Sequence, residues 1–194
     1  MKKYNLNSLL SQINNGYFIQ IGANDGISND EFGLKNLLEN ELHNAILIEP
    51  IQSYYLQLIN NYKNFKSKLC FENIAITEKQ ETKFLSLNGQ DSSFVRPHDG
   101  DKIEVNCDTI QSIFNKYNIK KINGLFIDVE GYEFNILKSL FSHQYPPIDF
   151  IRYEFWWAEN KQELDDLLIN NGYSVFQDEY SYADKIAIHN SILN

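Results

Sequence analysis

Acidic residues and glycines stand at the points where several apolar segments of this sequence end. Gly22-Ala23-Asn24-Asp25-Gly26 closes the apolar run that begins at Tyr17, and Glu49-Pro50 closes the run that begins at Ala45. Asp128-Val129-Glu130-Gly131 closes the run that begins at Leu125, and Glu154 closes the run that begins at Ile148. In an open α/β sheet, ligands bind outside the carboxyl ends of the strands. Carboxylates gathered at that edge could bind a polar ligand and accept or donate protons in a reaction.

The glycine-containing loop limits which ligand fits. A dinucleotide-binding loop would read G-x-G-x-x-G, whereas Gly22 and Gly26 stand four residues apart and enclose Asn24 and Asp25. This spacing leaves less room for a pyrophosphate, and an acid repels phosphate but attracts an ammonium group. Glu49, at the end of the next segment, can accept hydrogen bonds from both hydroxyls of a ribose. A nucleoside that carries an amino acid is S-adenosylmethionine, and we expect that ligand.

The elements that must position these residues alternate between strand-like and helix-like stretches. Apolar, strand-like runs cover residues 17–22, 45–50, 69–76, 125–130, 148–155, 173–178 and 185–190. Strands alternating with helices predict a doubly wound α/β sheet, mostly parallel. The link between the last two runs is too short for a crossover helix, so this C-terminal pair should be antiparallel.

Two segments depart from the alternation. Residues 1–16 read as a helical lead-in, and residues 77–107 read as a hairpin-like insertion with a long polar loop. Among the helices, the stretch 29–42 should bury a face that includes Leu34, Leu37, Leu38 and Leu42. The helix that follows the insertion should open on a capping Asp108.

Composition and charge exclude several classes of protein. With 194 residues, 43% of them hydrophobic, the chain can bury a full core, and we expect one domain over 1–194. The net charge of −9 argues against a nucleic-acid partner, which needs a basic surface. No apolar run approaches about 18 residues, so we expect no signal peptide and no membrane span, and hence a cytoplasmic protein.

Several of these segments together resemble a known family. The segments IQIGANDG, LIEP, ENIAIT, DTIQSIFNKY, LFIDVEGYEFNIL and IRYEF follow one another between Tyr17 and Glu154. They resemble the FkbM family of S-adenosylmethionine-dependent methyltransferases, and LFIDVEGYEFNIL is the most specific of them. The resemblance implies the class I methyltransferase (Rossmann-like) fold and S-adenosylmethionine as cofactor.

The resemblance also implies roles for single residues. The loop from Gly22 through Ala23 and Asp25 to Gly26 would bend around the methionine part of the cofactor, and Glu49 would hold its ribose. The predicted contacts to the adenine are Pro50, Ile51, Asn73 and Ala75. The family usually has an acid at the position of Gln20, which here could place a water or the ammonium group. It commonly has a lysine at the position of Phe126.

Methyl transfer to a hydroxyl group needs an acceptor in line with the methyl group and profits from a base. The candidate catalytic residues are Asp128, Glu130 and Glu154, and Asp128 also counts among the cofactor contacts. These three acids could instead hold a hard divalent cation. A third possibility is that acids here, including Glu133, only cap the helix that follows Gly131.

The candidate acceptor contacts are Ser93, His98, Glu133, Trp156 and Trp157. Flat tryptophan rings match the apolar face of a sugar, although core packing also explains such residues. We therefore expect an O-methyltransferase for a hydroxyl on a sugar or other small-molecule or glycan acceptor. One alternative is a catalytically inactive S-adenosylmethionine-binding scaffold, for which Gln20 and Phe126 argue. A nucleotide-dependent oxidoreductase is disfavoured by the missing third glycine, and nothing in the sequence predicts an oligomeric state.

Overall fold

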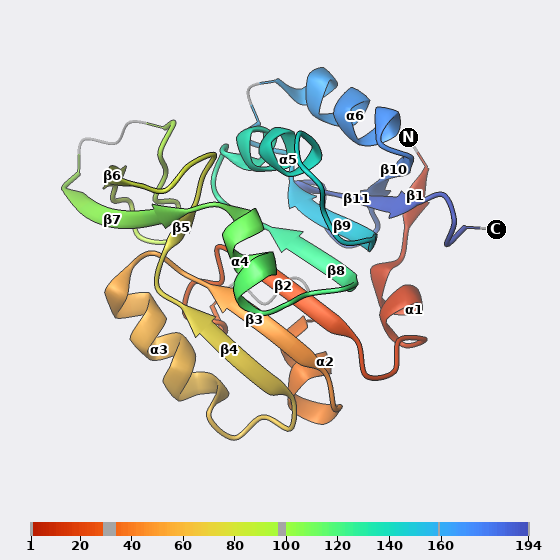
Figure 1. Cartoon of the computed structure of the whole chain (residues 1–194), viewed down its shortest axis with the longest axis horizontal. Coiled ribbons are helices and arrows are strands. Elements are labelled where there is room, and N and C mark those ends of the chain that lie inside the picture. Colours follow the sequence, from red (N-terminus) through yellow and green to blue (C-terminus); the bar gives the residue numbers. More distant parts are fainter. Residues whose placement is uncertain (1, 29–33, 97–99, 159, 194) are drawn as a thin grey trace.

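A mixed sheet of eight strands runs through the part of the chain that the computed structural model describes, residues 2–28, 34–96, 100–158 and 160–193 (Figure 1). Its strand order is β1-β10-β11-β9-β8-β2-β3-β4. The bounds are β1 (Lys3–Tyr4), β2 (Tyr17–Ile21), β3 (Asn44–Ile48), β4 (Lys68–Glu72), β8 (Ile122–Ile127), β9 (Ile148–Glu154), β10 (Tyr173–Asp178) and β11 (Asp184–His189).

The pairing of these strands confirms the predicted fold. β11 runs antiparallel to both β9 and β10, and the other neighbours in the sheet are parallel. From β2 the chain moves outward to β3 and β4, then returns to β8 on the other side of β2 and continues to β9. The direction of winding therefore reverses between β2 and β8, and a ligand site is expected outside their carboxyl ends.

Helices cover both faces of the sheet, which explains why its central strands are apolar on both sides. The bounds are α1 (Leu6–Leu10), α2 (Leu34–Asn40), α3 (Gln52–Tyr62), α4 (Ile110–Lys116), α5 (Glu133–Phe141) and α6 (Lys161–Asn170). On β2, Ile19 and Ile21 pack into the core formed with α4, α5 and α6, whereas Phe18 packs into the core formed with α1, α2 and α3. None of the described helices combines the length and apolar character that crossing a membrane would need.

A second, smaller sheet stands beside the carboxyl ends of the main strands (Figure 1). It contains β5 (Ala75–Ile76), β7 (Lys102–Asp108) and β6 (Glu81–Ser86) in that order, with β6 and β7 antiparallel. The predicted run 69–76 is thus divided between two sheets. The reason lies at Asn73, whose side-chain amide donates to the carbonyls of Glu49 and Pro50 at 2.9 and 3.0 Å and turns the chain out of β4.

Two details of the predicted helices are wrong. Leu34, Leu37 and Leu38 are buried as expected, but Leu42 lies beyond the end of α2 and is 64% exposed. The cap of α4 is Thr109, whose side chain accepts a hydrogen bond from the Ser112 amide, while Asp108 still belongs to β7. Both errors concern the position at which a helix begins or ends, which apolar periodicity indicates only approximately.

Candidate active site

The loop that follows β2 crosses the carboxyl ends of the neighbouring strands. The amides of Gly22 and Ala23 both donate to the carbonyl of Ile48, at 3.0 Å. Gly22 has a φ of +81°, and a Cβ there would stand only 1.7 Å from the backbone carbonyl oxygen of Asp128. Glycine is therefore required at this position, because it alone lets the ends of β2 and β8 approach so closely.

Glu49 connects this loop to the end of β3. Its carboxylate accepts hydrogen bonds from the Asn24 amide at 2.9 Å and from the Ile51 amide at 2.7 Å. Burial raises the pKa of Glu49 to about 7, against the opposing effect of these two hydrogen bonds. Each carboxylate oxygen has a further lone pair, so Glu49 can hold the loop and still accept a hydrogen bond from a ligand.

A cavity opens at this edge of the sheet, where an open α/β fold places its ligand. Eight of the residues predicted for the site border it: Gly22, Asn24, Glu49, Pro50, Ile51, Ala75, Asp128 and Glu130. The insertion and the elements next to it complete the wall with Tyr54, Ile74, Ile76, Leu85, Gly89, Gln90, Ser92, Phe94, Val129 and Tyr132. The cavity therefore joins an apolar slot beside Glu49 to an acidic end beside Asp128.

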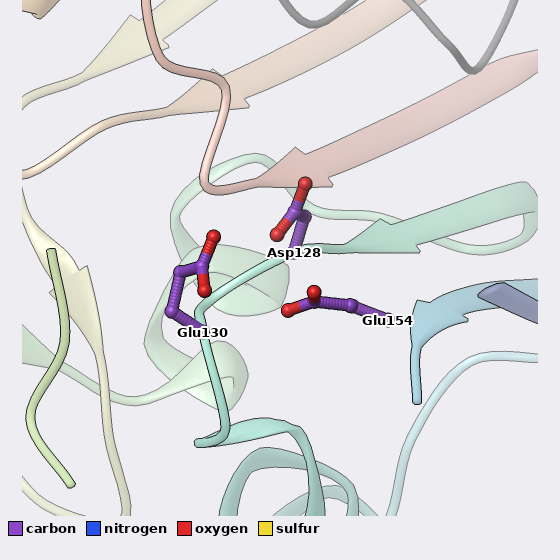
Figure 2. Close-up of side chains that lie close together, drawn as sticks. All are labelled: Asp128, Glu130 and Glu154. Atoms are coloured by element: carbon purple, nitrogen blue, oxygen red, sulfur yellow. The ribbon is translucent and has the colours of Figure 1, made fainter. Parts of the chain in front are cut away.

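A cluster of three carboxylates, Asp128, Glu130 and Glu154, converges at the acidic end (Figure 2). Asp128 and Glu130 border the cavity, whereas Glu154 lies next to them outside its lining. Each of the three contributes an oxygen, and these oxygens all lie within 4.8 Å of one another. Asp128 follows β8 and Glu154 ends β9, and these strands are parallel neighbours, so their carboxyl ends meet. Glu130 reaches the same place from the connecting loop, where its backbone adopts a left-handed φ of 57°.

Burial and mutual repulsion dominate the electrostatics of this cluster. Burial, reinforced by the charges of Glu130 and Glu133, raises the pKa of Asp128 well above its usual range. Burial and the neighbouring Asp128 raise the pKa of Glu154 to about 10. Burial raises the pKa of Glu130 to about 7, although the Arg96 guanidinium opposes this shift. Burial and mutual repulsion therefore oppose ionisation of all three groups together near neutral pH, and the ion pair with Arg96 offsets this only at Glu130.

Comparison with known proteins adds family membership to this geometry. The Methyltransferase FkbM domain profile matches residues 20–175. The chain belongs to the FkbM methyltransferase family. The solved structure of a precorrin-6y C5,15-methyltransferase from Geobacter metallireducens GS-15 superimposes with a TM-score of 0.48 at 13% identity, covering 93% of this chain and 84% of that one. Comparison with curated proteins finds no match. The family predicted from the sequence is thus confirmed, and it supports methyl transfer from S-adenosylmethionine.

Five predicted cofactor residues of this FkbM-family chain do not border the cavity: Gln20, Ala23, Asp25, Gly26 and Asn73. The Asp25 carboxylate accepts hydrogen bonds from the Ile27 and Ser28 amides at 2.9 and 2.8 Å. Burial alone would raise the pKa of Asp25, but hydrogen bonds from Ser28 and Ile27 outweigh it and lower that pKa. Asp25 therefore ties the turn together, and the contact of its side chain with an ammonium group stays a prediction.

Glu133 and Ser93, two of the predicted acceptor contacts, bind the backbone of a nearby loop, and their contact with an acceptor stays a prediction. Glu133 is fully buried, and its carboxylate accepts from the Val129 amide at 2.9 Å and the Gly131 amide at 3.1 Å. The Ser93 hydroxyl donates to the Glu130 carbonyl at 2.6 Å and is also buried. Both side chains hold the loop that carries Glu130, and neither borders the cavity.

The two tryptophans follow Glu154 shortly after the end of β9 and do not border the cavity; Trp156 is 48% and Trp157 is 42% exposed. The Arg96 guanidinium stacks over the Trp157 ring at 3.7 Å from its centroid and forms an ion pair with Glu130. His98, the remaining predicted acceptor contact, lies outside the described residues. The role of Arg96 is missing from the sequence prediction, although the sequence contains only two arginines and this one lies in the polar loop of the insertion.

Replacing Glu49 by alanine should weaken binding of S-adenosylmethionine by about 1–3 kcal/mol, the cost of leaving charged hydrogen-bonding partners unpaired. The loss combines any bonds to the ribose with the bonds that hold Asn24 and Ile51. Calorimetry on folded protein measures it. Glu72→Ala is the matched control, because Glu72 ends the adjacent strand and pairs with Lys116 away from the cavity. Unchanged affinity in Glu49→Ala would remove Glu49 from the cofactor site.

Proposed function

We propose that this chain transfers a methyl group from S-adenosylmethionine to a hydroxyl group of a sugar or glycosylated small molecule. The observation that carries the proposal is one cavity bordered both by apolar residues around Glu49 and by Asp128 and Glu130, two of the three converging carboxylates. FkbM family membership supplies the methyl donor. That the acceptor is a hydroxyl group, and that it belongs to a sugar, goes beyond what family membership supports.

The slot beside Glu49 suits the nucleoside half of the cofactor. Pro50, Ile51, Ile74 and Ala75 give it apolar walls, which an adenine ring can fill while losing little to water. Glu49 stands where the ribose hydroxyls would follow, in the arrangement common to nucleoside sites at the ends of β-strands. The loop at Gly22 then leads from this slot toward the acidic end.

The acidic end suits the acceptor. The sulfonium is already a strong methyl donor, so the protein mainly has to orient the two reactants, which can lower the barrier by roughly 7–11 kcal/mol in the best cases. A hydroxyl also has to lose its proton, and Asp128, Glu130 and Glu154 are the groups placed to take it. As the acceptor oxygen bonds to the methyl carbon, the carbon–sulfur bond breaks with its electron pair left on sulfur.

The alternative of an inactive S-adenosylmethionine-binding scaffold rests on Gln20 and Phe126, and the positions of these two residues weaken it. Phe126 is fully buried and packs against Phe18 and Phe150, in the core on the α1–α3 face of the sheet. Gln20 pairs in register with Phe126 and is also buried. Neither side chain borders the cavity, so their departure from the family pattern leaves the chemistry of the acidic end intact.

The proposal is tested by incubating the protein with methyl-labelled S-adenosylmethionine and a pool of mono- and oligosaccharides. We expect label in a product that resists mild base, as an ether does and an ester does not. Cofactor binding without any transfer to the pool would favour the scaffold. Transfer only to amines or carboxylates would contradict the hydroxyl acceptor.

Replacing Trp156 by alanine should raise the KM for a sugar acceptor about fivefold while the affinity for S-adenosylmethionine stays unchanged. An aromatic stacking contact contributes about 1 kcal/mol beyond its buried area, and Trp156 offers a half-exposed ring two residues after Glu154. Phe84→Ala is the control, since Phe84 is 67% exposed on the outer side of β6. An unchanged KM would show that the ring has no part in acceptor binding.

A further inference from the structure

Asp128, Glu130 and Glu154 have the composition and the spacing of a cation site. We propose that these three carboxylates bind one hard divalent cation, such as Mg²⁺, Mn²⁺ or Ca²⁺, at the acceptor end of the cavity. Its use in catalysis, as the group that holds the acceptor hydroxyl, rests on the proposed function. Binding of the ion itself does not.

The distances fit a shared ion. Two oxygens bound to the same ion can be at most twice the metal–oxygen distance apart, about 4.2 Å for Mg²⁺ and about 4.6–5.2 Å for Ca²⁺. The three carboxylates each place an oxygen within 4.8 Å of the others. Figure 2 shows the side chains arriving from three directions, from the end of β8, the loop behind it and the end of β9. Small rotations of the side chains would close the site around a smaller ion.

An unpartnered oxygen gives independent support. Glu154 is only 9% exposed, and its Oε2 is buried without a hydrogen-bond partner among the residues that the structure describes. A buried carboxylate oxygen left without a partner is unfavourable, and more so when the group is charged. The Glu154 carboxylate points toward the other two acids (Figure 2). A cation placed between them would supply the partner that this oxygen lacks.

The balance of charge also favours an ion of charge +2. Arg96 forms an ion pair with Glu130 and offsets one of the three negative charges. The nearby Arg152 is already shared by Asp178 at 2.7 Å and Asp184 at 3.2 Å, so its charge is offset there. Two negative charges are left in a buried place, where unpaired charge is unfavourable. One divalent cation would neutralise them.

Such an ion would add a defined function to the acidic end. Hard cations take oxygen ligands and usually keep positions open for water or substrate. A hydroxyl of the acceptor could occupy one of these positions, which would fix its oxygen toward the methyl group and lower its pKa. The proton would pass to a carboxylate or to water before the oxygen–carbon bond forms. This requirement selects an acceptor whose hydroxyl can reach the ion through the cavity that Asp128 and Glu130 border.

Titration of the whole chain with Mn²⁺ tests the proposal, with the spectrum of free Mn²⁺ followed by electron paramagnetic resonance. We expect one ion per chain, displaced by Mg²⁺ or Ca²⁺. Changes in outer-shell residues alone typically cost about 10- to 100-fold in metal affinity, so Glu154→Gln and Glu130→Gln should each lose about 100-fold or more. Glu163→Gln, which changes an exposed acid on α6, should bind as the natural chain does.

The outcomes separate the ion from the methyl transfer. Absence of saturable Mn²⁺ binding would overturn the proposal, even if methyl transfer is observed and the proposed function holds. If Glu154→Gln and Glu130→Gln both bound Mn²⁺ as tightly as the natural chain, the proposal would also be overturned, because the ion would then lie elsewhere. Loss of binding in either folded variant, checked by circular dichroism, supports the site even if no acceptor in the pool is methylated.

Discussion

Asp128→Asn is expected to lower turnover by about 10²- to 10⁴-fold while affinity for S-adenosylmethionine barely changes, because the amide keeps the shape but loses proton acceptance. Asp128 follows β8 and borders the cavity beside Glu130 and Glu154. The same change removes a charged oxygen ligand if a cation is bound, so the expected direction is the same for both roles. Single-turnover rates at saturating cofactor give the effect, and calorimetry gives the affinity.

Asp149→Asn is the matched control for this prediction. Asp149 lies near the amino end of β9, at the opposite edge of the same sheet, where it pairs with Lys121 at 2.9 Å. It should lose little turnover. If the acids after β8 only capped α5, Asp128→Asn would cost about 1 kcal/mol of stability and leave turnover intact. An active Asp128→Asn enzyme would therefore refute the proposed mechanism.

Gly22→Ala is expected to destabilise the fold strongly and to abolish cofactor binding. A Cβ at Gly22 would lie 1.7 Å from the Asp128 carbonyl oxygen, and this atom belongs to the backbone of the neighbouring strand end. The two strand ends must separate, which moves the loop and Asp128 together. We expect a loss of more than about 3 kcal/mol, or about 10 °C in Tm for a chain of this length.

Gly89→Ala separates the clash from the effect of backbone conformation. Gly89 also has a positive φ, +59°, but the nearest atom to its added Cβ would be the Tyr54 hydroxyl at 3.9 Å. Only the conformational cost of about 1–2 kcal/mol remains there. Thermal unfolding followed by circular dichroism compares the two variants. Equal losses in both would show that β2 and β8 do not need their close approach.

The fold and the centre of the site were predictable because both depend on where strands end. Apolar runs indicate the strands, parallel strands bring their carboxyl ends to one edge, and Glu49, Asp128 and Glu154 follow such runs. The role of each side chain was harder to predict from the sequence. Glu133 and Asp25 are acids near the same edge, yet they bind backbone amides of their own loops, and the sequence does not tell which acid a nearby amide will take.

The wall contributed by the insertion was beyond sequence reasoning for another reason. Phe94 and Arg96 reach the site because the polar loop after β6 folds back over the edge of the sheet, where the Ser86 and Ser93 backbones bond to each other at 3.0 and 3.2 Å. Periodicity in the sequence describes regular elements and carries no information about the path of such a loop. Tyr54 and Tyr132 line the cavity from helix starts, where their direction depends on that same packing.

The left-handed backbone of Glu130 sets stability against activity at one position. A residue with a side chain in that conformation costs about 1–2 kcal/mol, a cost that glycine avoids. Glycine at position 130 would thus relax the backbone and remove one of the three converging carboxylates. Selection for thermal resistance alone would favour that exchange, whereas a lineage that keeps glutamate there is retaining the carboxylate against its own folding.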